Sequence, residues 1–336
     1  MDFINAIILL LNYTILPALT YGSQLAIGAI FVTLIYGILR FANFATGDMM
    51  SFGTMFAVLF TYYLQSKGIS FGFLPTALLT IPFAVAMMIF YMLIIDKTVF
   101  SYYRIKKSPP VQLAMVSIGV MFVTQAIIRI IIGPTNRRFM DGEKFILKAS
   151  ELKDMTGLAE GLTIKSTQII TIVVTIILVA ILFWFLNKTK TGTSMRAYSD
   201  NEDLALLSGI DPKKVVLITW IIAGILATIG GVLYGLDKSY RPFVYFNNML
   251  PIFAAAIAGG IGNPYGAFLG GYLIAFAEIF LTYAYKKFFI YILPEQLEPD
   301  SLMQLLSTDY KFAISFSILV IVLVFRPSGI FEGKKI

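Results

Sequence analysis

Polar residues interrupt the sequence after Arg40, at the beginning of an otherwise hydrophobic segment. They supply an amide, a hydroxyl and a carboxylate in close succession, around one glycine: Asn43, Thr46, Gly47 and Asp48. Asn43 or Thr46 can cap a helix, and a carboxylate is favourable near the positively polarised N-terminus of a helix. The same groups can also line a polar path through apolar surroundings, and the residue types alone leave both interpretations open.

A second unusual stretch, residues 258–271, contains six glycines. A proline inside a membrane helix frees backbone groups that lipid cannot satisfy, so such a break should face protein or a water-filled cavity. Glycines four residues apart also let membrane helices approach closely. The stretch predicts either a discontinuous helix beside a translocation path or a tight packing corner, formed by Gly259, Gly260, Gly262, Asn263, Pro264 and Gly266.

Glu278 lies in the middle of an apolar run. A charge at that depth costs about 3 kcal/mol on insertion scales, so its carboxylate should face a partner or water. Arg129, a basic residue inside another apolar run, is a candidate partner. Glu278 is then either part of a transport path or a structural carboxylate. Asp96 and Arg40 stand near the ends of apolar runs and are expected only to extend toward the membrane surface.

The polar loop at 187–214 contains the signature of a short helix. Asp200 or Asn201 can cap its start, acidic residues fill the first turn, Gly209 ends it and a proline follows. Two helical turns are marginal alone in water, so the exposed leucines need a surface to pack against. The loop is either a docking helix for a cytoplasmic partner or a plain connector. The candidate docking residues are Arg196, Asp200, Asn201, Glu202, Asp203, Leu204, Leu207 and Gly209.

The chain contains no cysteine and no histidine. Thiol nucleophiles, disulfides, cysteine metal sites and Ser-His-Asp triads are therefore excluded, and the most common metal ligand is absent. The phosphate-binding pattern G-x-x-x-x-G-K-[ST] is also missing, so another chain must hydrolyse any ATP that is used. We assign no catalytic residue, no metal site and no cofactor. The basic residues are scattered over short loops, which speaks against nucleic acid as a partner.

The composition identifies the surroundings that must position these residues. Of 336 residues, 58% are hydrophobic and only 13% charged, whereas soluble domains carry about 25% charge. A bilayer-spanning helix needs about 20 apolar residues. The pattern predicts an all-α polytopic membrane protein with eight to ten transmembrane helices, drawn from runs at 18–39, 44–64, 71–95, 111–133, 167–186, 214–236, 250–262, 266–285 and 311–326.

The seventh of these runs is too short to span a membrane alone, so we expect one broken or re-entrant helix near 250–266. Residues 3–16 are expected to form an interfacial helix or a first membrane helix that stays attached. No low-complexity linker divides the chain, which predicts a single membrane domain over residues 1–336.

The orientation follows only weakly from charge, because basic residues divide almost evenly between the two sides. The absence of basic residues before Arg40 and the basic C-terminal end favour an external N-terminus and an internal C-terminus. In this orientation the 187–214 loop is cytoplasmic and the 134–166 loop is external. The external loop is long enough for a small subdomain or a surface helix from Asp141 to Glu160.

Together these stretches resemble the permease subunits of branched-chain amino-acid ABC importers of the LivH type. The resemblance rests on four motifs in the family's order: Asn43-Phe44-Ala45 with Gly47-Asp48, Arg196-Ala197 with Gly209-Ile210, the glycine-rich stretch, and the ending Phe325-Arg326-Pro327-Ser328-Gly329-Ile330. It covers nearly the whole chain. No single motif is specific for the family. The resemblance rests on the four motifs occurring together in the family's order and spacing.

The resemblance implies a subunit of the bacterial or archaeal cytoplasmic membrane that forms half of a pore and is surrounded by membrane lipid. The implied partners are a second related permease, two cytoplasmic ATPase subunits and an external substrate-binding protein. The helix from Asp200 to Leu207 would be the coupling helix that fits a groove of an ATPase. Thr46 and Asp48 stand where the family often has His and Glu. Branched-chain amino acids are the expected substrates, with urea, short amides or other small polar solutes as alternatives.

Two other classes of protein share some of these features. A stand-alone secondary transporter or channel also has broken helices and buried carboxylates, but it does not need a capped, leucine-bearing cytoplasmic helix. A polytopic membrane enzyme needs a cluster of catalytic groups at one membrane face, whereas the carboxylates here are dispersed.

Overall fold

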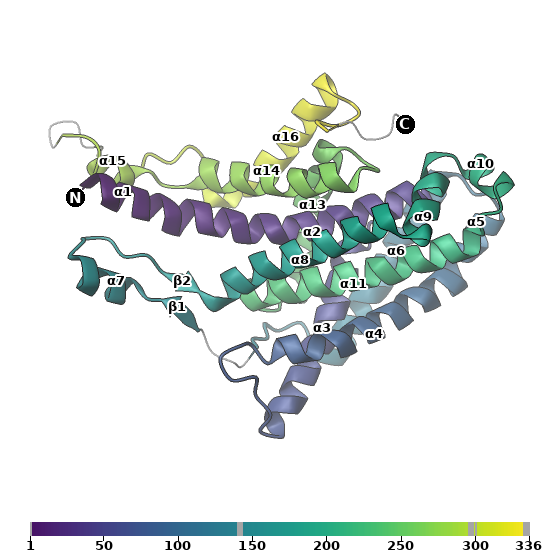
Figure 1. Ribbon diagram of the computed structural model, residues 1–336, viewed down its shortest axis with the longest axis horizontal. Coiled ribbons are helices and arrows are strands. Elements are labelled where there is room, and N and C mark those ends of the chain that lie inside the picture. The colour runs from purple at the N-terminus through teal and green to yellow at the C-terminus, as the bar shows by residue number, and fades with distance from the viewer. Residues whose placement is uncertain (1, 140–143, 295–298, 300, 332–336) are drawn as a thin grey trace.

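The protein is a bundle of long helices in the computed structural model, which describes residues 2–139, 144–294, 299 and 301–331 (Figure 1). Eight helices in the described part are long and apolar enough to cross a membrane. The all-α polytopic fold predicted from the sequence is therefore confirmed. The remaining long helix, α3 (Thr46–Ser66), is more polar than these eight.

Eight of the nine long helices that the structure describes agree with the predicted apolar runs to within three residues, and α4 (Ala77–Ile95) begins six residues later than predicted. In chain order the nine are α2 (Leu16–Leu39), α3, α4, α6 (Pro110–Ile132), α8 (Ser166–Lys188), α11 (Pro212–Lys238), α13 (Met249–Gly259), α14 (Pro264–Thr282) and α16 (Lys311–Phe325). The shorter elements are α1 (Asp2–Leu10), η1 (Leu11–Ile15), η2 (Asp96–Phe100), α5 (Ser101–Ile105), β1 (Phe145–Leu147), α7 (Ala149–Thr156), β2 (Ile164–Lys165), α9 (Lys190–Asp200), α10 (Glu202–Leu207), α12 (Pro242–Asn247), α15 (Lys286–Ile290) and η4 (Thr308–Tyr310).

Helix α2 is the centre of the bundle, packed by α14, α11, α13 and α8. Nearly all of its side chains are buried. Through the π-helical turn η1 it continues α1, so residues 2–39 form one helix of 38 residues. Of the two forms expected for residues 3–16, the interfacial helix is not observed, and these residues form the first part of the first long helix. At a rise of about 1.5 Å per residue, this helix is longer than the roughly 30 Å hydrocarbon core.

The glycine-rich stretch forms a tight hairpin of two antiparallel helices. Helix α13 ends at Gly259, and α14 begins at Pro264, capped by the side chain of Asn263. A Cβ on Gly259 would lie 2.2 Å from the carbonyl oxygen of Gly266, so the two backbones are in direct contact. The stretch therefore forms a turn between two separate helices, and the expected broken single helix is not observed.

The first arm of this hairpin is longer than the sequence indicated. The short helix α12 precedes α13, and together they form an 18-residue stretch, Pro242–Gly259, with the length and hydropathy of a membrane span. The prediction that this segment is too short to cross the membrane missed α12. The C-terminal segment packs against the hairpin turn, since the N–H of Ile330 donates to the carbonyl of Ala258 at 2.8 Å.

The two ends of the bundle differ. One end, here called the α10 end, contains α5, α9 and α10; the opposite β end contains the N-terminus, α7, α15 and a two-stranded antiparallel sheet of β1 and β2 (Figure 1). The surface helix expected from Asp141 to Glu160 is shorter, at Ala149–Thr156, and the expected start falls on residues 140–143, outside the described part. The loop folds onto α1, since Asn5 Oδ1 accepts the N–H of Glu160 at 3.2 Å.

The contact between α14 and α2 yields a test of the packing. A Cβ on Gly271 would lie 2.5 Å from both the Cα and the N of Ala26, which are backbone atoms that cannot move aside alone. We expect Gly271→Ala to cost about 1–3 kcal/mol, because overpacking pushes the two helices apart. The measurement is the melting temperature of the purified protein, followed by fluorescence-detected size-exclusion chromatography after heating.

Gly119 in α6 is the matched control, because nothing lies within 4 Å of a Cβ built there. Gly119→Ala should leave the melting temperature unchanged or raise it, as alanine favours a helix by about 1 kcal/mol over glycine. Equal melting temperatures for both variants would contradict the close approach of α14 to α2.

Candidate functional site

Helix α10 has the boundaries that the sequence predicts. Asn201 is its N-cap, with Oδ1 accepting the N–H of Leu204 at 3.1 Å. Glu202 and Asp203 fill the first turn, and the chain leaves the helix through Gly209 at a φ of 79°. This positive φ is the conformation that glycine adopts without a steric penalty.

The outer face of α10 is apolar and exposed. Leu207 is 85% exposed and Leu204 60%, while Ala205 on the other side is buried. Residues three apart lie on one face of a helix, so the two leucines form a single apolar patch at the α10 end. Such a patch in a charged loop is typical of a surface that another protein covers.

Helix α9, which lies in the part of the 187–214 loop where no helix was predicted, connects α10 to the bundle. It begins after Thr189, whose side chain caps it by accepting the N–H of Gly192 at 3.0 Å. This cap is the signal that could have revealed the helix. Arg196 and Asp200 belong to α9 and line a cavity beside it, so they do not share the leucine face of α10.

Tyr198 joins α9 to α10. Its hydroxyl donates to Glu202 Oε1 at 2.6 Å. Burial raises the pKa of the Tyr198 phenol, and the hydrogen bond to the Glu202 carboxylate raises it further, so this donor keeps its proton at neutral pH. A displacement of α10 is therefore passed to α9 through a short, persistent contact.

Two hydrogen bonds fasten α9 to the end of α2. The carbonyl of Ser199 accepts from Arg40 Nη2 at 2.5 Å, and the Ser199 hydroxyl donates to the carbonyl of Gly37 at 2.9 Å. Arg40 follows the last residue of α2 and has a left-handed backbone, with φ 59°. Arg40 thus holds the α9–α10 unit against α2 and does not simply extend toward the membrane surface, as was expected.

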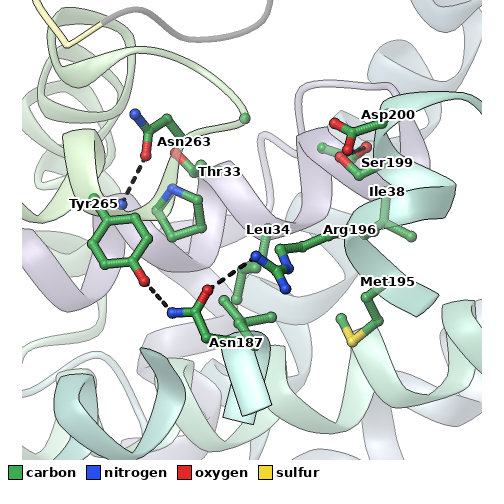
Figure 2. Close-up of a pocket in the computed structure, with 14 residues that line it drawn as sticks. Thr33, Leu34, Ile38, Asn187, Met195, Arg196, Ser199, Asp200, Asn263 and Tyr265 are labelled. Carbon is green, nitrogen blue, oxygen red and sulfur yellow. Dashed lines mark hydrogen bonds between the residues drawn. The ribbon is translucent and has the colours of Figure 1, made fainter. Parts of the chain in front are cut away.

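A cavity of about 250 Å³ separates α9 from the hairpin turn (Figure 2). Its walls come from α2, α8, α9 and the α13–α14 turn. Across it, Asn187 accepts from Arg196 Nη1 at 3.0 Å and donates to the hydroxyl of Tyr265. This bridge connects the α9 side of the cavity to the hairpin, so the motifs around Arg196, Gly262 and Asn263 meet at one place.

The first polar stretch lies inside the bundle. After Arg40 the chain runs without helical structure until α3 begins at Thr46, and Asn43, Thr46 and Asp48 are each at most 1% exposed. The N–H of Phe44 donates to Ser117 Oγ at 3.0 Å, in the interior of α6. Irregular backbone is tolerated at membrane depth only where protein or water satisfies it, which is the case here.

Neither Asn43 nor Thr46 caps α3 as expected. Ala45 is the N-cap, and its N–H donates to Asn43 Oδ1 at 3.1 Å, while Thr46 Oγ1 donates back to the Asn43 carbonyl at 2.6 Å. The two side chains therefore stabilise the turn before α3. A Cβ on Gly47 would lie 2.4 Å from the carbonyl oxygen of Tyr245, so Gly47 allows α12 to approach.

Asp48 is the charged group of this segment. In the first turn of α3, its Oδ2 accepts from Gln125 Nε2 at 3.1 Å, and the guanidinium of Arg129, one turn further along α6, acts on the same carboxylate. Gln125 was not singled out from the sequence, because an amide within a span has no distinctive local pattern. An acid, an amide and a base are thus neighbours, with Asp48 buried, Gln125 half-buried and Arg129 exposed.

Glu278 is held by α16 and not by Arg129. Its carboxylate accepts from Ser315 Oγ, and Lys311, also on α16, supplies the nearest positive charge. The expected pairing with Arg129 is wrong, because Arg129 faces Asp48. Glu278 is 1% exposed and ties α14 to α16, which supports the structural interpretation of this carboxylate.

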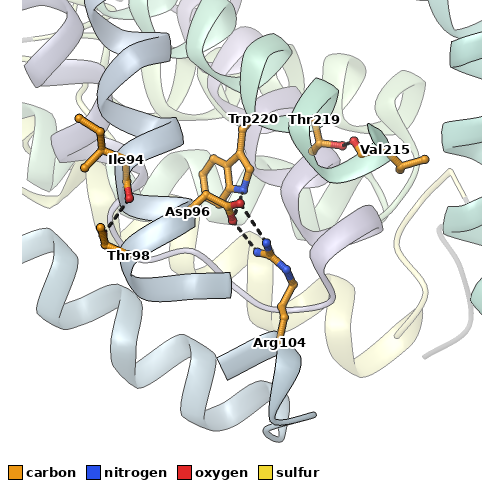
Figure 3. A network of polar contacts seen from close by, with 7 residues as sticks. All are labelled: Ile94, Asp96, Thr98, Arg104, Val215, Thr219 and Trp220. Carbon is orange, nitrogen blue, oxygen red and sulfur yellow. Dashed lines mark hydrogen bonds and ion pairs between the residues drawn. The ribbon is translucent and has the colours of Figure 1, made fainter. Parts of the chain in front are cut away.

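A second polar cluster, missed by the sequence analysis, braces the α10 end (Figure 3). Asp96 accepts from both terminal nitrogens of Arg104, at 2.5 and 2.9 Å, and from Trp220 Nε1 at 2.7 Å. Asp96 therefore binds α5 to the fully buried Trp220 of α11, instead of extending to the membrane surface as expected. In the described part, no three acidic residues come close enough together to hold a metal ion.

Comparisons with known proteins show the family to which the chain belongs. The family described as "Branched-chain amino acid transport system / permease component" matches residues 14–323. The chain belongs to this permease family. It is a multi-pass protein of the cytoplasmic membrane and a permease subunit of an ABC importer, which is a transport subunit that works with ATPase and substrate-binding partners.

Several curated relatives extend over most of the chain. The high-affinity branched-chain amino acid transport system permease protein LivH of Escherichia coli K12 is 27% identical, covering 94% of each chain. The corresponding protein BraD of Pseudomonas aeruginosa is 26% identical over 95% of this permease and 94% of its own length. A probable LivH of Methanocaldococcus jannaschii is 28% identical over 79% of each chain. No solved structure matches the permease.

The Asp96 cluster generates a prediction on stability. Asp96→Asn removes the charge that pairs with Arg104, and both side chains are mostly shielded, at 16% and 25% exposed. We expect a loss of about 1–3 kcal/mol, seen as a melting temperature lower by a few degrees. Asp237→Asn is the control, because its partner Lys238 is 57% exposed and such pairs contribute at most about 1 kcal/mol. Equal shifts for both variants would refute the bracing role of Asp96.

Proposed function

We propose that two permeases, this chain and a related second one, together form the pore of an importer for branched-chain amino acids. In this proposal the α10 end faces the cytoplasm and carries two ATPase subunits, and the β end faces an external binding protein. The observation that carries it is the leucine face of α10, exposed at one end of the bundle and connected by hydrogen bonds to the interior.

The assignment of the α10 end to the cytoplasm rests on the docking face of α10, with a small contribution from charge, because the basic residues divide almost evenly between the two sides. The segments 96–110 and 187–214 carry nine basic residues between them, while the first 39 residues, which reach the β end, carry none. Basic loops are favoured on the cytoplasmic side. The permease lacks a phosphate-binding loop, so ATP hydrolysis is assigned to the separate subunits that cover α10.

Coupling is mechanical in this scheme. An ATPase that binds Leu204 and Leu207 moves α10. The hydrogen bond between Tyr198 and Glu202 then moves α9 with it. The bonds of Ser199 to Arg40 and Gly37 pass the displacement to the end of α2 and to the non-helical segment that follows. That segment leads to Asp48, so movement at the docking surface alters the polar interior without any chemical step.

The substrate class is inferred from the relatives and from the interior chemistry. The curated relatives of greatest coverage are named for branched-chain amino acid transport. An amino acid carries an ammonium and a carboxylate, which require partners of both signs when they leave water. Asp48 and Arg129, with Gln125 between them, provide an acidic group and a basic group close to each other. We therefore favour amino acids over urea or short amides, which carry no net-charged groups to pair.

The experiment that tests the function is uptake of labelled leucine in cells that lack their own branched-chain systems. The permease is expressed with its second permease, ATPases and binding protein. We expect concentrative uptake that isoleucine and valine inhibit and urea does not. Uptake by the permease alone, driven by an ion gradient, would contradict the proposal and indicate a secondary transporter.

Leu207→Asp tests the docking surface in the same assay. A charge in the centre of an apolar interface should reduce leucine uptake by about tenfold or more, with loss of the ATPases on co-purification. Insertion should be unaffected, because the side chain is 85% exposed. Ile105→Asp at the same end is the control, since Ile105 is 79% exposed but lies on α5. Normal uptake by Leu207→Asp would remove α10 from the mechanism.

Arg40→Ala tests the transmission step. The variant loses the bond to the Ser199 carbonyl but keeps the docking face of α10. We expect ATPases that still bind and hydrolyse ATP, with leucine transported per ATP reduced by about threefold or more, as expected for losing one charge-assisted hydrogen bond. Arg40→Lys should restore part of the coupling, because lysine keeps one charged donor. A parallel loss of hydrolysis, uptake and bound ATPase would indicate a general folding defect instead.

A further inference from the structure

A small cavity, with about 10 Å³ open to the centre of a water molecule, lies in the interior, away from the docking surface. It is bounded by α2, α3, α11 and the junction of α12 with α13. The space accommodates a single water molecule and no larger solute. Both polar and apolar side chains line it, among them Gln24, Met50, Tyr234, Tyr245, Asn248 and Ile252.

Gln24 supplies the main polar groups. The residue is only 2% exposed, and neither its Oε1 nor its Nε2 hydrogen bonds to a described residue. Asn248, 5% exposed, likewise has an Oδ1 without a partner among the described residues. Two acceptors and a donor therefore border one small space, whereas buried polar groups in proteins are almost always hydrogen-bonded.

The chemistry of the lining selects the occupant. A water molecule has two donors and can accept as well, so it can serve Gln24 Oε1, Asn248 Oδ1 and Gln24 Nε2 together. An apolar occupant would leave all three groups unsatisfied. A cation is disfavoured because no carboxylate lines the cavity. The Tyr245 hydroxyl donates to the carbonyl of Gly231 at 2.9 Å and so does not compete as a donor.

We propose that Gln24 and Asn248 bind an internal water molecule that bridges α2 to the α12–α13 junction. Asn248 is the residue between these two helices, and its carbonyl accepts the N–H of Ile252. The water links the central helix to the point where the first arm of the hairpin changes direction. The site does not depend on the substrate or on the direction of transport.

X-ray radiolytic footprinting of the purified permease in nanodiscs tests this site. Hydroxyl radicals formed from bound water oxidise the side chains that touch it, even where bulk solvent is excluded. Met50 lines the cavity and is 4% exposed, whereas Met55, on the same helix, is 0% exposed and does not line it. We expect Met50 to be oxidised several times faster than Met55, and Tyr245 to be modified as well.

Gln24→Leu supplies the second arm of the test. It keeps the size of the side chain and removes the polar groups, so the oxidation rate of Met50 should fall to that of Met55. Asn248→Leu should act in the same direction, and Gln125→Leu, which changes an amide outside the cavity, should leave the rate unchanged. Equal rates for Met50 and Met55 in the unaltered permease would overturn the proposal. So would a Met50 rate that Gln24→Leu does not change.

Discussion

The backbone between Arg40 and Thr46 runs through the interior of a membrane protein without forming a helix. Lipid offers no hydrogen bonds, so every polar group of this segment has to find a partner inside the bundle. The N–H of Phe44 donates to the side chain of Ser117, and the N–H of Ala45 donates to the side chain of Asn43. The segment therefore depends on α6 beside it and on Asn43 within it. Helix α3 begins directly after this segment, and α12 packs against the start of α3 at Gly47.

Close backbone contacts make the surrounding bundle stiff enough to transmit movement. Gly47 admits α12 to α3, and Gly271 admits α14 to α2. Helices in such contact cannot slide without changing many atoms together, since interiors are densely packed. A small displacement of α9 can thus reach the buried segment through the end of α2. The hairpin turn is held separately, by the C-terminal chain and by the contacts across the cavity beside α9.

Local patterns in the sequence predicted much of this architecture. The spans follow from hydropathy, and the limits of α10 follow from a capping Asn201 and a terminating Gly209. Helix α9 was missed because its Gly, Thr and Ser residues are weak helix formers, and its stability comes from packing against α8. Trp220, which donates to Asp96, and Ser315, which donates to Glu278, lie 124 and 37 residues away, so no local spacing reveals them. The meeting of Arg40 with Ser199, 159 residues apart, is also a tertiary result.

In the proposed importer an ATPase subunit covers α10 and moves the interior of the bundle through it. Because the chain contains no cysteine, a single Leu207→Cys substitution places one reactive thiol on the docking face. The measurement is cross-linking of this thiol to the assembled ATPases with a short bifunctional maleimide, with Leu305→Cys at the β end as the reference. If an ATPase subunit covers α10, we expect a cross-link to it from position 207 and none from position 305. A cross-link from position 305 alone, or from neither position in an active complex, would contradict the proposal.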